Sequence, residues 1–359
     1  MTAGYSLPAS MRAAVVKDGA FAIREVPVPS PAAGDLLVKV EAASLCGTDL
    51  RILRAGHRKM PAGTERVLGH EFAGVVVKAS PAAGDLFGKR VAVAPNIGCG
   101  ECHLCRRGLT NLCPDYQALG IGLDGAFAQY VRVPAEAVSQ GNVVPLPDEL
   151  SWDAGALNEP LSCVIRGLEA TGMKPGESVL IFGAGPIGLM FLRLARLLGA
   201  GQVILVQRSA SRRELAPAGG ADLLLDFGED GGERMQEAVL ETTGNRGVDV
   251  AIVAAPVAEA QTAALKLLAV GGRLNLFGGL PPGRSLTQMD ANLIHYRELV
   301  VTGTTGQTVA QYRRGLDLQA RGLRLDDLIT ARYPLQAFGE ALAAAADKTG
   351  LKVMVNPNQ

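Results

Sequence analysis

The sequence has few aromatic residues and no excess of charge of either sign. Aromatic residues make up 4% of the 359 positions, and the formal net charge is zero because Lys+Arg and Asp+Glu both number 35. No run of Lys or Arg is longer than two residues. A protein that neutralises many phosphates needs a basic face. The composition therefore argues against nucleic acid as a partner.

Long apolar runs are also missing. A transmembrane helix needs about 18 or more consecutive apolar residues, and the chain contains no such stretch. Residues 1–10 have neither a basic start nor an apolar segment, so they do not resemble a secretory signal. We therefore expect a soluble protein without a membrane partner, located in the cytoplasm.

The abundant residues indicate an α/β protein with two domains. There are 44 glycines, and 48% of the residues are hydrophobic, which is typical of parallel sheets buried on both faces. A chain of 359 residues is also too long for one simple core. The first third is β-rich, whereas buried strands alternate with helices from about residue 160, as in a doubly wound parallel sheet. Strands are expected at 11–17, 36–43, 71–77, 179–182, 203–206, 248–255, 273–277, 299–301 and 352–355, and helices at 187–198, 259–268, 311–320 and 335–347.

Four of the six cysteines, Cys99, Cys102, Cys105 and Cys113, lie within fifteen residues. Without a secretion signal, metal binding is favoured over disulfides. Four thiolates at this spacing can surround one Zn²⁺, because a C-x2-C turn places two sulfurs on one side of the ion. The alternative, free cysteines in a core, is disfavoured by the polar surrounding sequence. We predict a closed, structural zinc site without a catalytic role.

A second candidate metal site is spread along the chain. Cys46 stands alone, His70 and Glu71 are adjacent, and Glu159 precedes a proline. One thiolate, one imidazole and a carboxylate can form an open zinc site that accepts a substrate oxygen. By spacing alone, an isolated Cys and an isolated His are more often core residues than ligands, so the residues themselves leave both interpretations open.

A glycine-rich turn follows the strand at 179–182 and opens the next helix. Bare glycines let the backbone approach a pyrophosphate, which the helix N-terminus stabilises. An ordinary turn between a strand and a helix is the alternative. We predict a dinucleotide site whose turn consists of Gly183, Ala184, Gly185, Pro186, Ile187 and Gly188.

The end of the next strand indicates which dinucleotide is preferred. NAD-binding folds place an Asp or Glu there to hold the ribose hydroxyls, but this chain has Gln207, Arg208 and Ser209, with Arg212 shortly after. A carboxylate would repel a 2′-phosphate, whereas a neutral amide beside an arginine can accept one. NADP is therefore favoured over NAD. If Arg208 only stacks on the adenine, NAD would still be used.

Together these motifs resemble those of the zinc-dependent medium-chain dehydrogenases, over residues 11–355 and most closely in the sorbitol and threonine dehydrogenase branch. The matching segments are Cys46-Gly-Thr-Asp, Gly69-His-Glu, the four-cysteine cluster, Gly125-Ala-Phe-Ala-Gln-Tyr-Val, Asn158-Glu-Pro-Leu and the glycine-rich turn. Their number and order make the resemblance specific. The resemblance therefore favours a metal site formed by Cys46, His70, Glu71 and Glu159 over isolated core residues.

The resemblance implies a domain organisation. A GroES-like, β-rich catalytic domain would comprise residues 1–158, completed by 308–359. A Rossmann domain with a doubly wound parallel sheet would comprise residues 159–307. The family also implies a homo-oligomer, either a tetramer or a dimer.

The resemblance also implies roles for individual residues. The catalytic zinc would be bound by Cys46, His70 and Glu71. Glu159 would bind the zinc or exchange with its water, and Thr48 would hydrogen-bond the reacting hydroxyl and begin a proton relay. Thr304 and Thr305 would contact the cofactor. Zinc would lower the pKa of a bound alcohol, which would then release hydride to the nicotinamide.

Two departures from the family pattern bear on function. Many relatives have a histidine five residues after the zinc cysteine, where this chain has Arg51. The last step of the relay would therefore differ, and the arginine could instead contact an anionic substrate or the cofactor phosphate. The Arg-Tyr pair that sorbitol dehydrogenases often carry near residues 303–307 is absent.

The leading hypothesis is a zinc-dependent oxidoreductase that converts a secondary alcohol of a polyol, sugar or cyclitol into the ketone with NAD(P). A threonine-type amino-alcohol dehydrogenase is the alternative with the same cofactors. A non-enzymatic relative that only binds dinucleotide is disfavoured because every zinc ligand and Thr48 are present. A zinc-free quinone reductase is disfavoured because it would lack the thiolate, the imidazole and the four-cysteine cluster.

Overall fold

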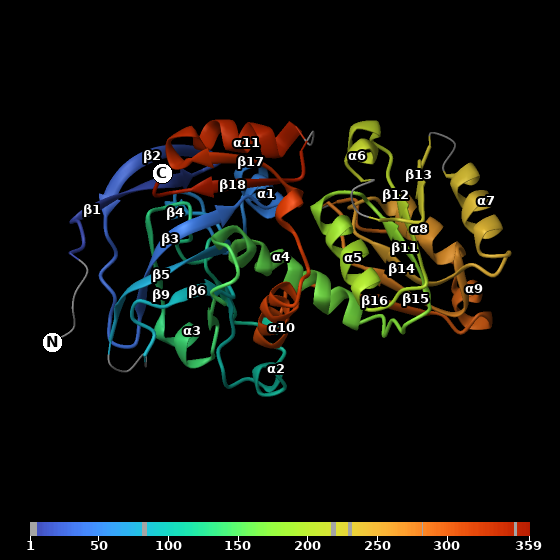
Figure 1. Ribbon diagram of the computed structural model, residues 1–359, viewed down its shortest axis with the longest axis horizontal. Coiled ribbons are helices and arrows are strands. Elements are labelled where there is room, and N and C mark those ends of the chain that lie inside the picture. The colour runs from blue at the N-terminus through green and yellow to red at the C-terminus, as the bar shows by residue number, and fades with distance from the viewer. Residues whose placement is uncertain (1–5, 81–84, 217–219, 229–231, 282, 348–349) are drawn as a thin grey trace. The chain divides into compact units, whose positions relative to one another are not determined.

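The computed structural model describes residues 6–80, 85–216, 220–228, 232–281, 283–347 and 350–359 (Figure 1). The chain divides into two compact units, Met1–Ser162 with Gly306–Gln359 and Cys163–Thr305. The domain boundaries expected from the sequence, after residues 158 and 307, fall a few residues from these divisions. No helix in the described segments is long and apolar enough to cross a bilayer.

The first unit is built mainly on β-strands. A seven-stranded sheet has the order β10-β6-β5-β3-β18-β17, with β9 also paired to β3, and smaller sheets have the orders β2-β1-β4 and β7-β8. The strands are β1 (Ser10–Lys17), β2 (Ala20–Pro27), β3 (Leu36–Ser44), β4 (Arg66–Val67), β5 (Glu71–Ala79), β6 (Arg90–Val93), β7 (Asn96–Ile97), β8 (Gln117–Ala118), β9 (Tyr130–Val133), β10 (Val143–Pro145), β17 (Ile329–Pro334) and β18 (Lys352–Asn356).

Three neighbouring strands of the large sheet, β18, β3 and β5, matter most for the site. Ser44 at the end of β3 pairs with Glu71 at the start of β5, and Met354 of β18 pairs with Ser44. The close approach of β3 and β5 depends on Gly74, because a Cβ there would lie 2.0 Å from the carbonyl oxygen of Lys39. This pairing brings together segments from opposite ends of the chain.

The first unit has six helices in the described residues, of which α4, α10 and α11 are the longest. They are α1 (Gly47–Ala55), α2 (His103–Arg106), α3 (Ala135–Ser139), α4 (Trp152–Glu169, which crosses into the second unit), α10 (Val309–Ala320) and α11 (Phe338–Asp347), with single 3₁₀ turns at Thr110–Leu112, Asp326–Leu328 and Leu335–Ala337. Helix α11 packs against β17 and β18 (Figure 1). Phe338 anchors it, since its ring lies 5.0 Å from that of Phe127 in the core.

The second unit is a six-stranded parallel sheet with the order β13-β12-β11-β14-β15-β16. Its strands are β11 (Ser178–Phe182), β12 (Gln202–Val206), β13 (Leu223–Leu225), β14 (Val248–Val253), β15 (Leu268–Leu276) and β16 (Val300–Gly303). Its helices are α5 (Pro186–Leu197), α6 (Ala210–Leu215), α7 (Glu233–Thr242), α8 (Ala258–Lys266) and α9 (Ala291–Tyr296). This strand order is that of the Rossmann fold, so the predicted fold class is confirmed.

Sequence patterns predicted five of the six strands of this unit, because these strands are short apolar runs, and they predicted helices α5 and α8. Strand β13 and helices α6, α7 and α9 were not expected. Helix α5 shows the usual signals, with Pro186 at its first position, a buried apolar face, and Gly199 just beyond its end at φ +87°. Helix α4 was not expected. Pro160 lies inside it, and a proline removes one helical donor, which weakens the helical pattern.

Candidate active site

Cys46 lies between β3 and α1, at the position that caps the helix. Its backbone N–H donates to Oδ2 of Asp49 at 2.9 Å, which ties the start of α1 to the loop that carries the thiol. Asp49 is fully buried, and its other oxygen, Oδ1, lies 3.4 Å from Nδ1 of His70. One carboxylate therefore orients both Cys46 and His70.

The structure brings three of the four predicted catalytic-zinc ligands together. Ligand atoms of Cys46, His70 and Glu71 all lie within 4.8 Å of one another. His70 and Glu71 are 5% and 0% exposed. Because Nδ1 of His70 faces Asp49, Nε2 is left for a metal. A thiol, an imidazole and a carboxylate are all zinc ligands, and catalytic zinc sites combine three protein ligands with a further open position.

The surroundings of His70 favour a positive charge. Burial alone lowers the pKa of His70, but the carboxylate of Asp49 and the thiolate of Cys46 raise it well above its ordinary value. A metal cation would satisfy the same anionic groups and displace this proton. The donor set is therefore suited to a divalent cation.

Glu71 presents its two carboxylate oxygens differently. Oε2 accepts hydrogen bonds from Ser44 Oγ and from Lys352 Nζ, whereas Oε1 is buried without a hydrogen-bond partner. Lys352 also donates to the carbonyl oxygen of Leu45 at 3.0 Å. Burial alone lowers the pKa of Lys352, but the charges of Glu71, Cys46 and Glu159 raise it overall. The unpartnered oxygen of Glu71 is available to a metal.

Glu159 is not part of the three-residue cluster. It is buried on α4 and near enough to Lys352 to affect its charge state. Thr48 lies in the first turn of α1, where its Oγ1 accepts a hydrogen bond from Nη2 of Arg51 at 3.1 Å. An arginine is always protonated and only donates, so the Thr48 hydroxyl keeps its own hydrogen for another acceptor.

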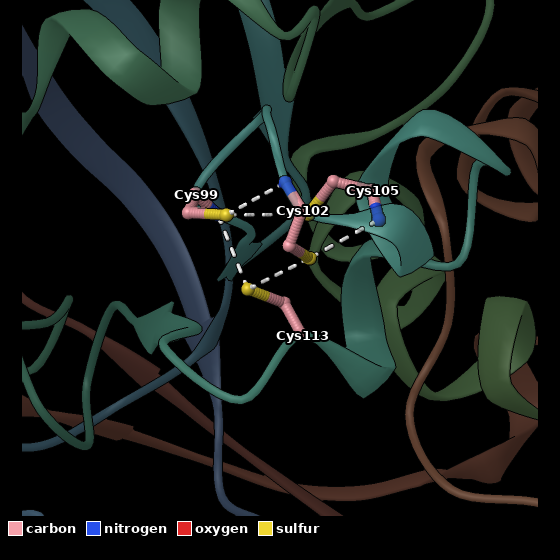
Figure 2. Close-up of side chains that lie close together, drawn as sticks. All are labelled: Cys99, Cys102, Cys105 and Cys113. Carbon is pink, nitrogen blue, oxygen red and sulfur yellow. Dashed lines mark hydrogen bonds between the residues drawn. The ribbon is translucent and has the colours of Figure 1, made fainter.

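The four-cysteine cluster is compact (Figure 2). The Cys99 and Cys105 sulfurs are 4.0 Å apart, and those of Cys102 and Cys113 are 3.9 Å apart. Four sulfurs at the Zn–S distance of about 2.3 Å would stand about 3.8 Å apart in a tetrahedron. Disulfide sulfurs would be about 2 Å apart. The geometry therefore fits a closed metal site.

Backbone hydrogen bonds and burial shift the pKa values of these thiols in opposite directions. The N–H groups of Glu101 and Cys102 lower the pKa of the Cys99 thiol to about 7. Burial raises the pKa of Cys105 to about 12. A bound divalent cation would favour the thiolate form of all four and release their protons.

In the second unit, the glycine-rich turn is closely packed between β11 and α5. Gly183 has φ +108° and donates its N–H to Val206 O at 2.8 Å. A Cβ on Gly188 would lie 1.7 Å from Gly183 O, so only glycine fits there. This close packing gives the turn the geometry of a dinucleotide-binding loop.

The predicted cofactor-selecting residues lie beside this turn. Gln207 accepts a hydrogen bond from Ala184 N at 2.8 Å through Oε1. Arg208 stacks over the Phe227 ring at 5.1 Å. Ser209 caps α6, and Arg212 lies against the turn, since a Cβ on Gly185 would come within 3.1 Å of Nη1.

Gln207 and Arg208 border a pocket of about 110 Å³ at the carboxyl ends of β11 and β12. Its walls are mostly apolar and consist of Phe182, Gly183, Val206, Gln207, Arg208, Phe227, Ala255, Val257 and Ala260. Thr304 follows β16 and donates to Oδ1 of the buried Asn275 at 3.3 Å. Thr305 is the last residue of the unit.

Sequence reasoning did not assign a role to Asp49, Ser44 or Lys352. Asp49 belongs to the Cys46-Gly-Thr-Asp segment, so its proximity to Cys46 could have been noticed. Lys352 gives only a weak signal, a lysine at the start of an apolar strand. Its contact with Glu71 joins residues 281 positions apart, which spacing does not reveal.

Two family models match the chain. The alcohol dehydrogenase GroES-like domain matches residues 32–148, and the zinc-binding dehydrogenase model matches residues 186–321. The chain is 37% identical to an L-threonine 3-dehydrogenase of Pyrococcus abyssi over 92% of this chain and 94% of that protein. It is 33% identical to the sorbitol dehydrogenase of Bacillus subtilis, over 99% of both chains.

A solved structure from Sinorhizobium meliloti 1021, bound to NADP, is similar throughout. The TM-score is 0.88, with 37% identity over 98% of this chain and all of that one. The fold, the site and these similarities define a dehydrogenase with a GroES-like domain and a Rossmann domain. The chain belongs to the zinc-dependent medium-chain dehydrogenases, in the branch of the sorbitol and threonine dehydrogenases.

Proposed function

We propose that this enzyme oxidises a secondary alcohol to the ketone, with zinc at the Cys46, His70 and Glu71 cluster and NADP as the hydride acceptor. The observation that carries the proposal is that these three ligand atoms lie within 4.8 Å of one another. We assign the metal chemistry to residues 1–158 with 308–359 and the cofactor to residues 159–307.

The chain's own residues prepare the alcohol for reaction. Bound zinc supplies a Lewis acid that lowers the pKa of the alcohol. Asp49 keeps His70 oriented for ligation, and Thr48 donates its hydrogen to the substrate oxygen or accepts from it. Because Arg51 cannot release a proton at neutral pH, the proton leaves Thr48 by a route that does not pass through residue 51. We also assign Glu159 to the zinc site, either as a ligand or beside the zinc-bound water.

The second zinc belongs in the four-cysteine cluster. Its sulfur separations of 3.9 and 4.0 Å support this assignment. With four thiolate ligands the site is closed to substrate, so it stabilises the local fold rather than the reaction.

NADP is the preferred cofactor in this proposal. A neutral Gln207, with Arg208 and Arg212 beside the turn, suits a 2′-phosphate better than a carboxylate would. The NADP-bound relative from Sinorhizobium meliloti supports the assignment. The glycine-rich turn would take the pyrophosphate, the apolar pocket the adenine, and Thr304 with Thr305 the nicotinamide half.

The substrate class is a polyol, sugar alcohol or cyclitol. Threonine is a second candidate, which the 37% identity to the Pyrococcus abyssi enzyme favours. We also propose that the enzyme is a homo-oligomer, to be tested by light scattering. The function is tested by screening polyols, cyclitols, sugar phosphates and threonine for reduction of NADP and NAD. Turnover of a polyol supports the leading assignment, turnover of threonine alone replaces it, and no turnover by zinc-loaded protein refutes both.

A further inference from the structure

Lys352 is the one buried lysine whose ammonium group reaches the candidate zinc ligands within the described residues. It is 4% exposed and opens β18. Its Nζ donates to Leu45 O, one residue before Cys46, and to Oε2 of Glu71. Burying an ammonium group is costly unless it is paired, and here the pairing charge comes from Glu71, a candidate metal ligand.

The hydrogen bonds at Glu71 distinguish its two oxygens. Oε2 accepts hydrogen bonds from both Ser44 Oγ and Lys352 Nζ, whereas Oε1 is buried and accepts none. A carboxylate oxygen that already accepts two donors, one of them charged, is a poor further ligand for a cation. A carboxylate free of such donors can bind a metal through both oxygens.

A catalytic zinc site depends on a position that the protein does not fill. Cys46, His70 and one oxygen of Glu71 supply three donors. A second oxygen from Glu71 would occupy the position that the alcohol needs. Groups that orient a ligand without touching the metal commonly decide such geometry.

We infer that Lys352, together with Ser44, is a positioning residue that restricts Glu71 to a single metal-binding oxygen and so keeps the substrate position open. This inference rests on the proposed function, because it concerns the metal of the same site. It assigns a role to the carboxyl-terminal strand, whose distance in sequence from Glu71 is 281 residues.

Cobalt substitution gives a direct readout of coordination, because the visible d–d absorption of Co²⁺ weakens as its coordination number rises. The experiment uses the full chain of wild type, Lys352→Met, Lys352→Arg and Ser44→Ala. Lys39→Met is the matched control, since Lys39 pairs with Glu41 at 2.8 Å on the same sheet. A Cys46→Ser variant gives the spectrum of the four-cysteine cluster alone, which is subtracted from the others.

We expect a severalfold weaker band in Lys352→Met, a smaller decrease in Ser44→Ala, and wild-type intensity in Lys352→Arg and Lys39→Met. The alcohol's kcat/KM should fall about 10- to 100-fold in Lys352→Met, with a wild-type dissociation constant for NADP. A role in folding alone would lower Tm or metal content without changing the band intensity per bound Co²⁺.

The inference is overturned if Lys352→Met and Ser44→Ala both keep the wild-type band. It is also overturned if Lys352→Met loses cobalt or does not fold while Ser44→Ala keeps the wild-type band, because Lys352 would then be needed only for binding or folding. If wild type and Cys46→Ser give the same spectrum, the dispersed cluster binds no metal and the proposed function itself fails.

Discussion

Replacing Asp49 by Asn tests how the fold prepares His70 for a metal. The carboxylate of Asp49 lies 3.4 Å from Nδ1 of His70, so Nδ1 keeps its proton facing that carboxylate when a metal displaces the proton on Nε2. In Asp49→Asn the amide oxygen can still accept from Cys46 N. The new NH₂ group would instead donate to Nδ1, which moves the imidazole proton to the ligating nitrogen.

The expected cost follows from the burial of this contact. Asp49 is fully buried, and its Oδ1 and His70 Nδ1 face each other at 3.4 Å while neither atom has a hydrogen-bond partner. Partners that orient a metal-binding histidine are typically worth about 10- to 100-fold in metal affinity, or about 1.4–2.7 kcal/mol. The assay is competition for zinc with a chromogenic chelator, with the zinc of the four-cysteine cluster as internal reference.

Asp124→Asn is the matched control. The Asp124 side chain is 62% exposed and pairs with Arg66 in the same unit. The zinc affinity of the Asp124→Asn variant should therefore equal that of wild type. If Asp49→Asn and Asp124→Asn retain zinc equally, the orientation of His70 by Asp49 does not contribute to metal binding and our reasoning about the donor set is wrong.

Three further substitutions test other parts of the account. Gln207→Asp should lower the ratio of kcat/KM with NADP to that with NAD, and an unchanged ratio would refute the assigned role of this position. Arg51→His introduces a group that titrates near pH 6.5 beside the Thr48 hydroxyl, so the kcat pH profile should gain an ionisation, and an unaltered profile would refute the role of Thr48 as the start of the proton relay. Gly188→Ala places a Cβ 1.7 Å from Gly183 O and should cost about 1–3 kcal/mol in unfolding free energy. It should also weaken NADP binding measured by calorimetry. Gly279→Ala, which meets nothing within 4 Å, should leave both unchanged, and equal behaviour of the two variants would contradict the role of the turn.

The sequence was most informative where structure depends on short-range pattern. The apolar runs before Gly183 and before Gln207 became β11 and β12 within one residue of expectation at their start. The four cysteines needed no tertiary information, because their spacing alone allows one metal to join them. In contrast, the mostly exposed β2 lacks a buried pattern, and the proline inside α4 hides a helix of 18 residues.

The catalytic cluster was only partly predictable, because it depends on strand pairing. The adjacency of His70 and Glu71 is visible in the sequence, but which oxygen of Glu71 accepts hydrogen bonds is decided by Ser44 of β3 and Lys352 of β18. Glu159 was predicted with the other three ligands and lies outside their cluster. Its role stays a prediction.

The most direct test of the central claim compares wild type with Cys46→Ser for zinc content, NADP binding and turnover of an alcohol that wild type oxidises. Loss of one of two zinc ions and of turnover, with NADP binding retained, is the predicted result. Equal turnover in the two proteins would contradict a zinc-dependent mechanism at Cys46.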